Sequence, residues 1–203
     1  ADFQVLGVDQ SSLASGDSAT PVAIGALVSG TYFVRVFGTQ TGSYTVKIED
    51  LGLDDHGNTM STASAVSLGS TSGTIGYVGD EDWLSFYAEA SRIYVITLTA
   101  TNQTTATLWN WSGQQGTFEF QRSFRAPIAE RYHLAIKGAA PGSYTVKIED
   151  RGYDDHGDLA SMATHVVPGT TVGTIGFGGD ADWFTFDTIP GRIYRVTLQS
   201  AGK

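Results

Sequence analysis

A repeat with a period of one hundred residues constrains the fold of this chain more than any other feature of its sequence. The nonapeptide GSYTVKIED occupies residues 42–50 and recurs letter for letter at residues 142–150, and the segments 51–100 and 151–200 then align without a gap. A fixed period of this length indicates tandem globular domains rather than a solenoid of short repeats. The sequence therefore predicts copies of one domain of about a hundred residues.

The phase of the repeat predicts where each domain begins. Counted from the acidic loop that follows the nonapeptide, residues 51–150 form a complete domain, 1–50 form the C-terminal half of a domain, and 151–203 form the N-terminal half of another. Half a sandwich cannot bury a core or pair its edge strands. We therefore expect 151–203 to be completed by 1–50, within one chain, from a neighbouring chain or along a continuing chain. A head-to-tail contact between chains does not close and would build a filament.

The composition favours an all-β fold. Glycine is frequent, with 25 residues, and charged residues make up only 16% of the chain. Short alternating segments joined by glycine-rich turns are typical of antiparallel sheets, so we expect jelly-roll-like β-sandwich domains in tandem. Strands are predicted at 31–37, 43–49, 83–87 and 93–99, the start of a strand at 74–77, a short helical turn or loop at 60–66, and one shared face for Phe3 and Val5. The side chains predicted to face the core are Tyr32, Val34, Val36, Tyr44, Val46, Ile48, Leu84, Phe86, Tyr94, Ile96 and Leu98.

Charge and cysteine content argue against several classes of protein. The formal net charge of −9 disfavours nucleic acid as a partner, because binding to phosphates requires Lys and Arg. The chain contains no cysteine, so it forms neither a disulfide nor a thiol site. No apolar run approaches the length of a membrane span. This composition fits a secreted protein that uses a cation where other small extracellular domains use disulfides.

Two acidic clusters occur in each copy of the repeat. DDHG at 54–57 is followed by GDEDW, and DDHG at 154–157 is followed by GDADW. Calcium takes about six to eight oxygen ligands, and Asp80 and Asp82 face the same way on an extended chain. We predict one calcium site in each copy; the alternative is a set of surface turns, in which Asp, Asn and Gly are common. The candidate ligands are Asp54, Asp55, Asn58, Asp80 and Asp82 in the first copy and Asp154, Asp155, Asp158, Asp180 and Asp182 in the second.

Several short motifs together point to a known family. DDHGN at 54–58, GTI at 73–75, GDxDW at 79–83 and RxY at 92–94 resemble the bacterial pre-peptidase C-terminal domain family, whose relatives include the collagen-binding domains of clostridial collagenases. The resemblance implies a secreted, calcium-stabilised β-sandwich that is not itself catalytic and is appended to enzymes or strung in tandem on surface proteins. It also implies that the ligands come from the acidic segment and from the Asp-x-Asp turn, although this chain lacks the Glu-Pro-Asn-Asn form of the first segment.

Aromatic and histidine residues offer two further candidates for a site. Trp109 and Trp111 lie on the same face of an extended strand, where they would form a stacking platform for sugars or peptide; the alternative is that one or both cover the edge of the core. His56 and His156 follow pairs of aspartates, but no nucleophile turn of the Gly-x-Ser-x-Gly type stands near them. We therefore expect no enzyme.

The sequence supports two hypotheses about function. The first is a non-catalytic, calcium-stabilised tandem β-sandwich segment of a secreted or cell-surface bacterial protein, which acts as a structural, fibre or adhesin element and assembles head to tail with copies of itself. The alternative is a carbohydrate- or matrix-protein-binding module attached to a secreted hydrolase.

Overall fold

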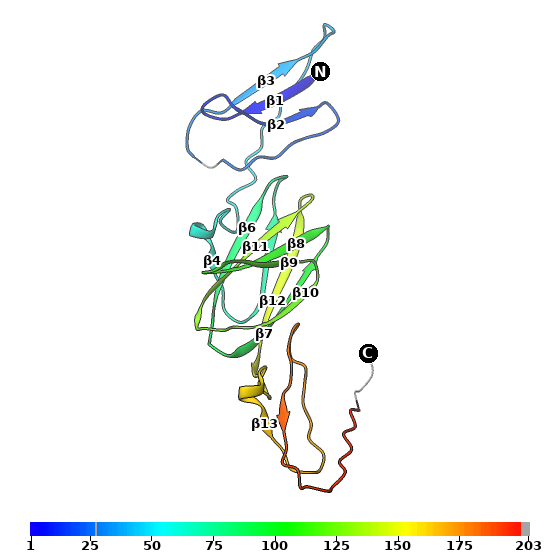
Figure 1. The fold of residues 1–203 in the computed structure, drawn as a ribbon. Helices are drawn as coiled ribbons and strands as arrows, with labels where there is room; N and C mark the ends of the chain where they lie inside the picture. Colours follow the sequence, from blue (N-terminus) through cyan, green and yellow to red (C-terminus); the bar gives the residue numbers. More distant parts are fainter. Residues whose placement is uncertain (27, 200–203) are drawn as a thin grey trace. The chain divides into compact units, whose positions relative to one another are not determined.

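The computed structural model describes residues 1–26 and 28–199 and is almost entirely made of strands (Figure 1). The chain divides into two compact units, Ala1–Gly152 and Tyr153–Lys203. The strands are β1 (Asp2–Leu6), β2 (Ser12–Asp17), β3 (Phe33–Phe37), β4 (Ser64–Ala65), β5 (Gly69–Ile75), β6 (Glu81–Ala88), β7 (Arg92–Ala100), β8 (Thr104–Asn110), β9 (Gly113–Phe118), β10 (Gln121–Arg125), β11 (Glu130–Gly138), β12 (Gly142–Tyr153), β13 (Thr164–His165) and β14 (Phe184–Thr185). Two short 3-10 turns, η1 (Met60–Thr62) and η2 (Ala160–Met162), interrupt them.

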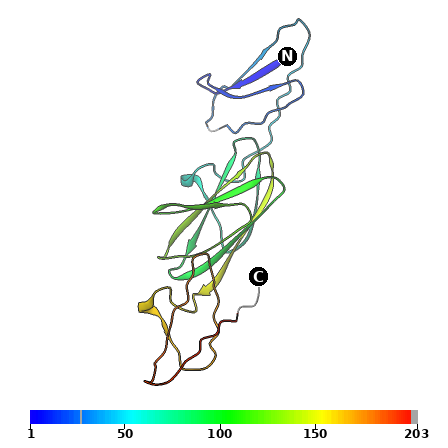
Figure 2. The ribbon, with the colours of Figure 1, turned by 45° about the vertical axis from the view of Figure 1, so that its right-hand side comes forward.

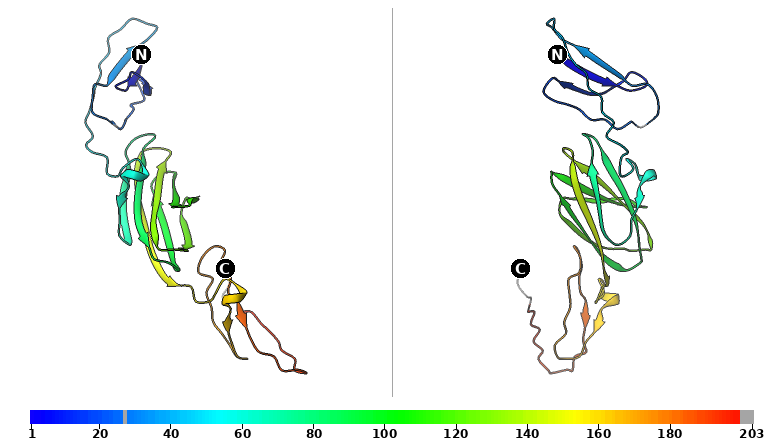
Figure 3. Two further views of the ribbon diagram at one scale, coloured as in Figure 1. Left: turned by 60° about the vertical axis from the view of Figure 1, so that its left-hand side comes forward. Right: turned by 180° about the vertical axis from the view of Figure 1, so that it is seen from behind.

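The strands β4 to β12 form one β-sandwich (Figures 1 and 2). One sheet has the strand order β10-β7-β12-β5 and the other has the order β4-β6-β11-β8-β9. The recorded pairings in these sheets are antiparallel, with the exception of the short β4, which runs parallel to β6. Figure 3 shows β12 running along the length of the sandwich to the point where the chain leaves it. The predicted fold class, an all-β protein with an antiparallel β-sandwich, is confirmed.

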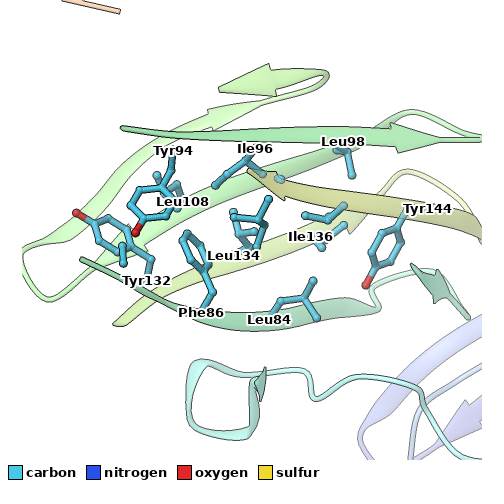
Figure 4. Packing of buried hydrophobic residues seen from close by; sticks show 14 of the residues in the cluster. Leu84, Phe86, Tyr94, Ile96, Leu98, Leu108, Tyr132, Leu134, Ile136 and Tyr144 are labelled. Atoms are coloured by element: carbon cyan, nitrogen blue, oxygen red, sulfur yellow. The ribbon is translucent and has the colours of Figure 1, made fainter. Parts of the chain in front are cut away.

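The core lies between the two sheets and follows the period of two that the sequence predicts. Leu84 and Phe86 of β6 and Ile96 of β7 are completely or almost completely buried (Figure 4). Each such side chain stabilises the fold by about 1.5–3 kcal/mol relative to leaving it in water. The predicted inward faces of 83–87 and 93–99 are therefore confirmed, as is the short helical turn at Met60–Thr62.

Residues 1–37 form a smaller sheet with the order β2-β1-β3. Its pairings reproduce those of β9-β8-β11 in the sandwich: Phe3 lies opposite Val36, as Ala106 lies opposite Ile136. On its other side Phe3 lies opposite Gly16. The corresponding pair in the sandwich, Ala106 opposite Phe118, exchanges the large and the small residue. Phe3 and Val5 alternate with other residues of β1 and so share one face, as predicted.

The structure corrects one predicted strand and shortens another. Residues 42–50 form no strand, and Tyr44, Val46 and Ile48 are exposed rather than inward-facing. The predicted strand at 31–37 begins at Phe33, and its supposed core residue Val34 is exposed. The physical reason is that no strand of the described residues lies beside 42–50, whereas β12, which has the same nine residues, is held between β7 and β5.

Residues 153–199 keep only the local part of the same fold. The parallel pair of β13 and β14 matches the pair of β4 and β6 one repeat earlier. The segments 169–175 and 192–199, which correspond to β5 and to most of β7, form no strand. The side chains of Ile193, Val196 and Leu198 are exposed there. The last four residues of the predicted half-domain 151–203 lie outside the described residues.

Candidate metal centre

Two loops meet at one end of the sandwich and carry the first acidic cluster. The loop 54–58 precedes η1, and the turn 76–80 joins β5 to β6. The backbone N–H of Trp83 donates to the carbonyl oxygen of Gly57 at 2.9 Å, which ties the loop to the start of β6. Gly79 has φ of +95°, a left-handed conformation that favours glycine.

The structure brings together three of the four carboxylates predicted in the first copy, and Asp80 lies outside this group of three. One oxygen each from Asp54, Asp55 and Asp82 lie within 4.8 Å of one another. Asp80 and Asp82 are completely buried, at 0% exposure. Asp80 Oδ2 accepts a hydrogen bond from the backbone N–H of Gly76 at 2.6 Å. Within residues 1–26 and 28–199, the remaining oxygen of Asp80 and both oxygens of Asp82 accept no hydrogen bond of regular geometry.

The electrostatics of the cluster disfavour four negative charges. Burial raises the pKa of Asp82 to about 7, and the charges of Asp80 and Asp55 add to the effect. The neighbouring hydroxyl of Tyr144 opposes the shift but does not reach regular hydrogen-bond geometry. Burial likewise raises the pKa of Asp80. In the part of the chain that the structure describes, no Lys or Arg forms an ion pair with these carboxylates.

Asn58 connects the two loops. Its Nδ2 donates to Asp54 Oδ2 at 2.7 Å, and its Oδ1 accepts from the backbone N–H of Glu81 at 3.0 Å. Both ends of the amide are thus engaged, so the geometry gives Asn58 a bracing role. Its predicted role as a direct metal ligand stays a prediction.

The second copy forms a looser version of the same cluster. Asp154, Asp180 and Asp182 place one oxygen each within 4.8 Å, and all three are partly exposed. Asp158 Oδ1 accepts from the backbone N–H of Ala181 at 3.3 Å, the position that Asn58 fills in the first copy. Asp155 lies outside this group of three, although its charge is among the causes that raise the pKa of Asp182, after burial and Asp180.

The roles of three residues at the two clusters were not predicted from the sequence: His56, His156 and Tyr144. His56 links its loop to the neighbouring strands, with Nδ1 2.9 Å from Ser64 Oγ, and His156 does the same with Thr164 Oγ1 at 2.9 Å. Tyr144 of β12 packs over Gly73 of β5, beside the carboxylates. The repetition of both histidines was a visible signal for a structural role. The place of Tyr144 depends on the register of β12 with β5, which is not visible in the sequence.

The two tryptophans predicted as a stacking platform differ in burial. Trp109 is partly buried and packs against Trp83, with the ring centroids 6.0 Å apart. Trp111 follows the end of β8 and is 76% exposed. Trp109 and Trp83 alternate with the buried Leu108 and Leu84, so the two rings lie on the outer face of their sheet. A ligand-binding role stays a prediction for both Trp109 and Trp111.

The comparisons with known proteins reach only the level of the fold. No family model matches the chain, and no curated protein matches it. A solved pre-peptidase C-terminal domain of a collagenase from Bacillus anthracis is 14% identical, with a TM-score of 0.38, over 43% of this chain and 94% of that chain. PliG, a periplasmic inhibitor of g-type lysozyme, is 13% identical in the Aeromonas hydrophila structure (43% of this chain, 96% of that chain, TM-score 0.34). PliG of Salmonella Typhimurium is 18% identical (44% and 97%, TM-score 0.35).

Likenesses of this strength carry no inference about activity. The class of the protein follows instead from its own sheets, which define an all-β chain built around an antiparallel β-sandwich. In the described residues no helix is long and apolar enough to cross a membrane.

Proposed function

We propose that this chain is a non-catalytic, calcium-stabilised β-sandwich segment of a secreted or cell-surface bacterial protein, where it serves as a structural or adhesin element. The observation that carries the proposal is the complete burial of Asp80 and Asp82, with one oxygen of Asp82 within 4.8 Å of oxygens of Asp54 and Asp55 and no basic side chain paired to these carboxylates among the described residues. Buried carboxylates require a compensating charge, a proton or a cation.

A calcium ion fits the chemistry of the donors. Every candidate donor is an oxygen, and the site contains no sulfur ligand, which suits a hard cation. Two carboxylates at about 5 Å repel by about 1 kcal/mol in water and by several times more near a protein surface. A divalent cation would relieve this repulsion and tie the loop 54–58 to the turn 76–80.

The burial argues against the alternative of surface turns. Aspartates in turns accept hydrogen bonds from nearby backbone N–H groups and remain in water. Asp9 is such a residue in this chain, since it is exposed and accepts from the backbone N–H of Ser11 at 3.0 Å. Asp82 differs from Asp9 in both respects.

Thermal unfolding with calcium or chelator tests the proposal. Millimolar calcium is the range in which extracellular modules bind, and we expect it to raise the melting temperature of the sandwich by several degrees, because a ligand that binds only the folded state stabilises it. The double variant Asp80→Asn/Asp82→Asn should lose the shift. Glu81→Gln is the matched control, because Glu81 lies between them and pairs with Lys137 at 2.8 Å. An identical melting curve in calcium and in chelator would refute the site.

The assembly part of the proposal rests on the segments 42–50, 169–175 and 192–199, which pair with no strand in the described residues. We infer that 1–50 of one copy completes 151–203 of the next, head to tail. Support comes from β1–β3, which reproduce the pairings of three sandwich strands, and from β13–β14, which reproduce two others. The two sets are complementary parts of one sandwich. The measurement is the mass in solution over a dilution series, and a compact monomer at every concentration would contradict it.

A second candidate function has one specific observation in its favour. The exposed indole of Trp111 is suited to stack on a sugar or a peptide. A carbohydrate- or matrix-binding module would be retained on a polysaccharide or collagen column, and Trp111→Ala would lose the retention. Failure of the native chain to bind any such polymer would count against this candidate.

A further inference from the structure

We propose that the outer face of the sheet β4-β6-β11-β8-β9 binds a neutral polysaccharide, with the indole rings of Trp83 and Trp109 as the stacking surface. This inference rests on the second candidate function and deepens it, because it names the class of polymer and adds a surface on the sheet to the exposed Trp111. Figure 4 shows Leu84 and Leu108, the neighbours of the two tryptophans in the chain, pointing into the core. The indoles therefore lie on the face of the sheet that points away from the core.

The two rings come from strands that are not neighbours. β11 lies between β6 and β8; Ala135 of β11 lies opposite Trp83 of β6, and Trp109 of β8 lies opposite His133 of β11. Two strand spacings separate β6 from β8 by about 9–10 Å, yet the ring centroids are only 6.0 Å apart, with an interplanar angle of 38°. The rings thus lean toward each other over β11. They account for the burial of Ala135, which faces outward and is only 5% exposed.

The other copy of these strands shows that the fold does not require the pair of rings. Strands β1 and β3 reproduce the pairing of β8 and β11, so Leu6 holds the place of the indole on β8 and Arg35 holds the place of Ala135. A tryptophan does recur at Trp183, the counterpart of Trp83. The ring on β6 is thus common to the repeat, whereas the ring on β8 and the small residue between the rings are specific to the sandwich. Because a cross-strand pair on an outer face adds little to the stability of a sheet, the pair points to a ligand.

The polar groups around the rings suit sugar hydroxyls, which both donate and accept hydrogen bonds. The hydroxyls of Thr107 on β8 and Thr117 on β9 lie 2.9 Å apart, in the row of residues next to Trp109. His133 lies opposite Trp109, and burial, with the charge of Arg131 as the smaller cause, lowers its pKa. The imidazole is therefore neutral near pH 7 and offers one donor and one acceptor.

The charges on this face favour a neutral polymer over an acidic one. Lys137 pairs with Glu81 at 2.8 Å, so its charge is compensated. Arg131 donates from Nη1 to Ser85 Oγ at 3.2 Å. The chain as a whole carries a formal net charge of −9, which repels polyanions.

The aromatic area of the face is smaller than a stable protein interface. Aromatic side chains bury about 150–250 Å² each. Trp83, Trp109 and Tyr87, which is 57% exposed on the same face, therefore stay below the roughly 800 Å² that such an interface buries on each side. Both indoles are partly buried already, so the area left to cover is smaller still. A narrow polymer chain fits this surface better than a globular partner does.

The other copy also supplies variants that alter the stacking surface and spare the fold. Trp109→Leu and Ala135→Arg each introduce the residue that the equivalent strand carries, Leu6 and Arg35. The first variant removes one ring, and the second leaves both rings but places a long side chain between them. Both variants should melt within a few degrees of the native chain.

Affinity electrophoresis of the full chain measures binding in gels that contain hydroxyethylcellulose, laminarin, galactomannan or heparin. We expect at least one of the three neutral polymers to retard the native chain, and heparin to leave its mobility unchanged. Trp109→Leu and Ala135→Arg should raise the dissociation constant about tenfold, as expected for the loss of one stacked ring. Trp183→Ala is the matched control and should keep the native value, because Trp183 is the counterpart of Trp83 and the only tryptophan of residues 153–199. Retardation by heparin alone, or native affinity in both sheet variants, would overturn the inference.

The outcomes separate this inference from the proposed function. Retention that is lost in Trp111→Ala and kept in Trp109→Leu would leave the second candidate function standing and overturn the sheet as its site. Retention on collagen without retardation by a neutral polysaccharide would overturn the class of ligand. Failure to bind every polymer tested would overturn the inference together with the second candidate function. The calcium shift in the melting of the sandwich is measured separately and tests the first proposal alone.

Discussion

The same nine residues occupy two different environments in this chain. In residues 142–150, Tyr144, Val146 and Ile148 are 2%, 0% and 2% exposed and belong to β12. In residues 42–50, the corresponding side chains are 66%, 46% and 79% exposed, and the segment forms no strand. Since the local sequence is identical, the difference comes entirely from neighbouring strands. The apolar alternation of a strand shows which face will be buried, and a partner decides whether it is buried.

A second pair of segments has the same structure in both copies of the repeat. The loop 54–58, the turn η1 and the parallel pair β4–β6 reappear one repeat later as 154–158, η2 and the pair β13–β14. These features depend on contacts within about thirty residues of sequence, so they form in the second copy without the distant strands. Structures of local origin therefore persist in a half-domain, and structures that need distant pairing do not.

The largest expected effect comes from matched truncations of the core. Leu98 is 3% exposed and Leu198 is 92% exposed, although both follow the same motif. Leu98→Ala should lower the free energy of unfolding by about 2–5 kcal/mol, because it leaves a cavity. Leu198→Ala should change it by less than about 0.5 kcal/mol. Denaturant unfolding at a concentration where the chain is monomeric gives both values, and similar losses in the two variants would contradict the contrast between these regions.

The sequence predicted the parts of the fold and of the site that depend on periodicity and composition. The alternation in β6 and β7 identified Leu84, Phe86 and Ile96 as core residues, and the repeated aspartates identified the carboxylates that meet at one end of the sandwich. The exposure of 42–50 and the place of Tyr144 over Gly73 were not predictable, because both depend on which distant strands lie alongside. A one-residue change of register would move Tyr144 to the opposite face.

The two acidic clusters should also differ in how they make the free energy of unfolding depend on pH. The pKa of Asp82 is raised to about 7 in the folded chain, above its usual value of 3.8. Between these values the folded state holds a proton that the unfolded state has released, so without divalent cations the stability contributed by this group is complete below pH 4. It is lost as the pH rises through 7.

The corresponding loss in the free energy of unfolding is at most about 4 kcal/mol over that range. Asp82→Asn should flatten the dependence, and Asp182→Asn is the matched control, because Asp182 is partly exposed in a segment outside the sandwich. Unfolding in chelator from pH 4 to pH 7 measures it, and a native chain whose stability rises steadily with pH would contradict the expected sign.

Calcium should stabilise the chain through the first cluster and not the second, and this difference in the free energy of unfolding is smaller than the effect of pH. At 10 to 100 times its dissociation constant, an ion that binds only the folded state stabilises it by about 1.4–2.7 kcal/mol. In dilute solution we expect this gain from the first cluster, since Asp80 and Asp82 are buried there. Asp54→Asn should abolish it and Asp154→Asn should preserve it. Calorimetric titration of the monomer checks the assignment, and the reverse pattern would show that the looser cluster is the stronger site.

The smallest effect is expected near the C-terminal end of β12, where an ion pair is present in one copy of the repeat and absent from the other. Arg92 Nε lies 2.6 Å from Asp150 Oδ2, and both side chains are mostly buried. In the described residues, Arg192 forms no ion pair, although Asp50 occupies the position that corresponds to Asp150. Arg92→Ala should therefore lower the free energy of unfolding by about 1 kcal/mol. Arg192→Ala should leave the dilute monomer unchanged. Because assembly would bring Arg192 next to Asp50 of another copy, the same variant should weaken self-association by a few-fold, and sedimentation velocity would detect that loss.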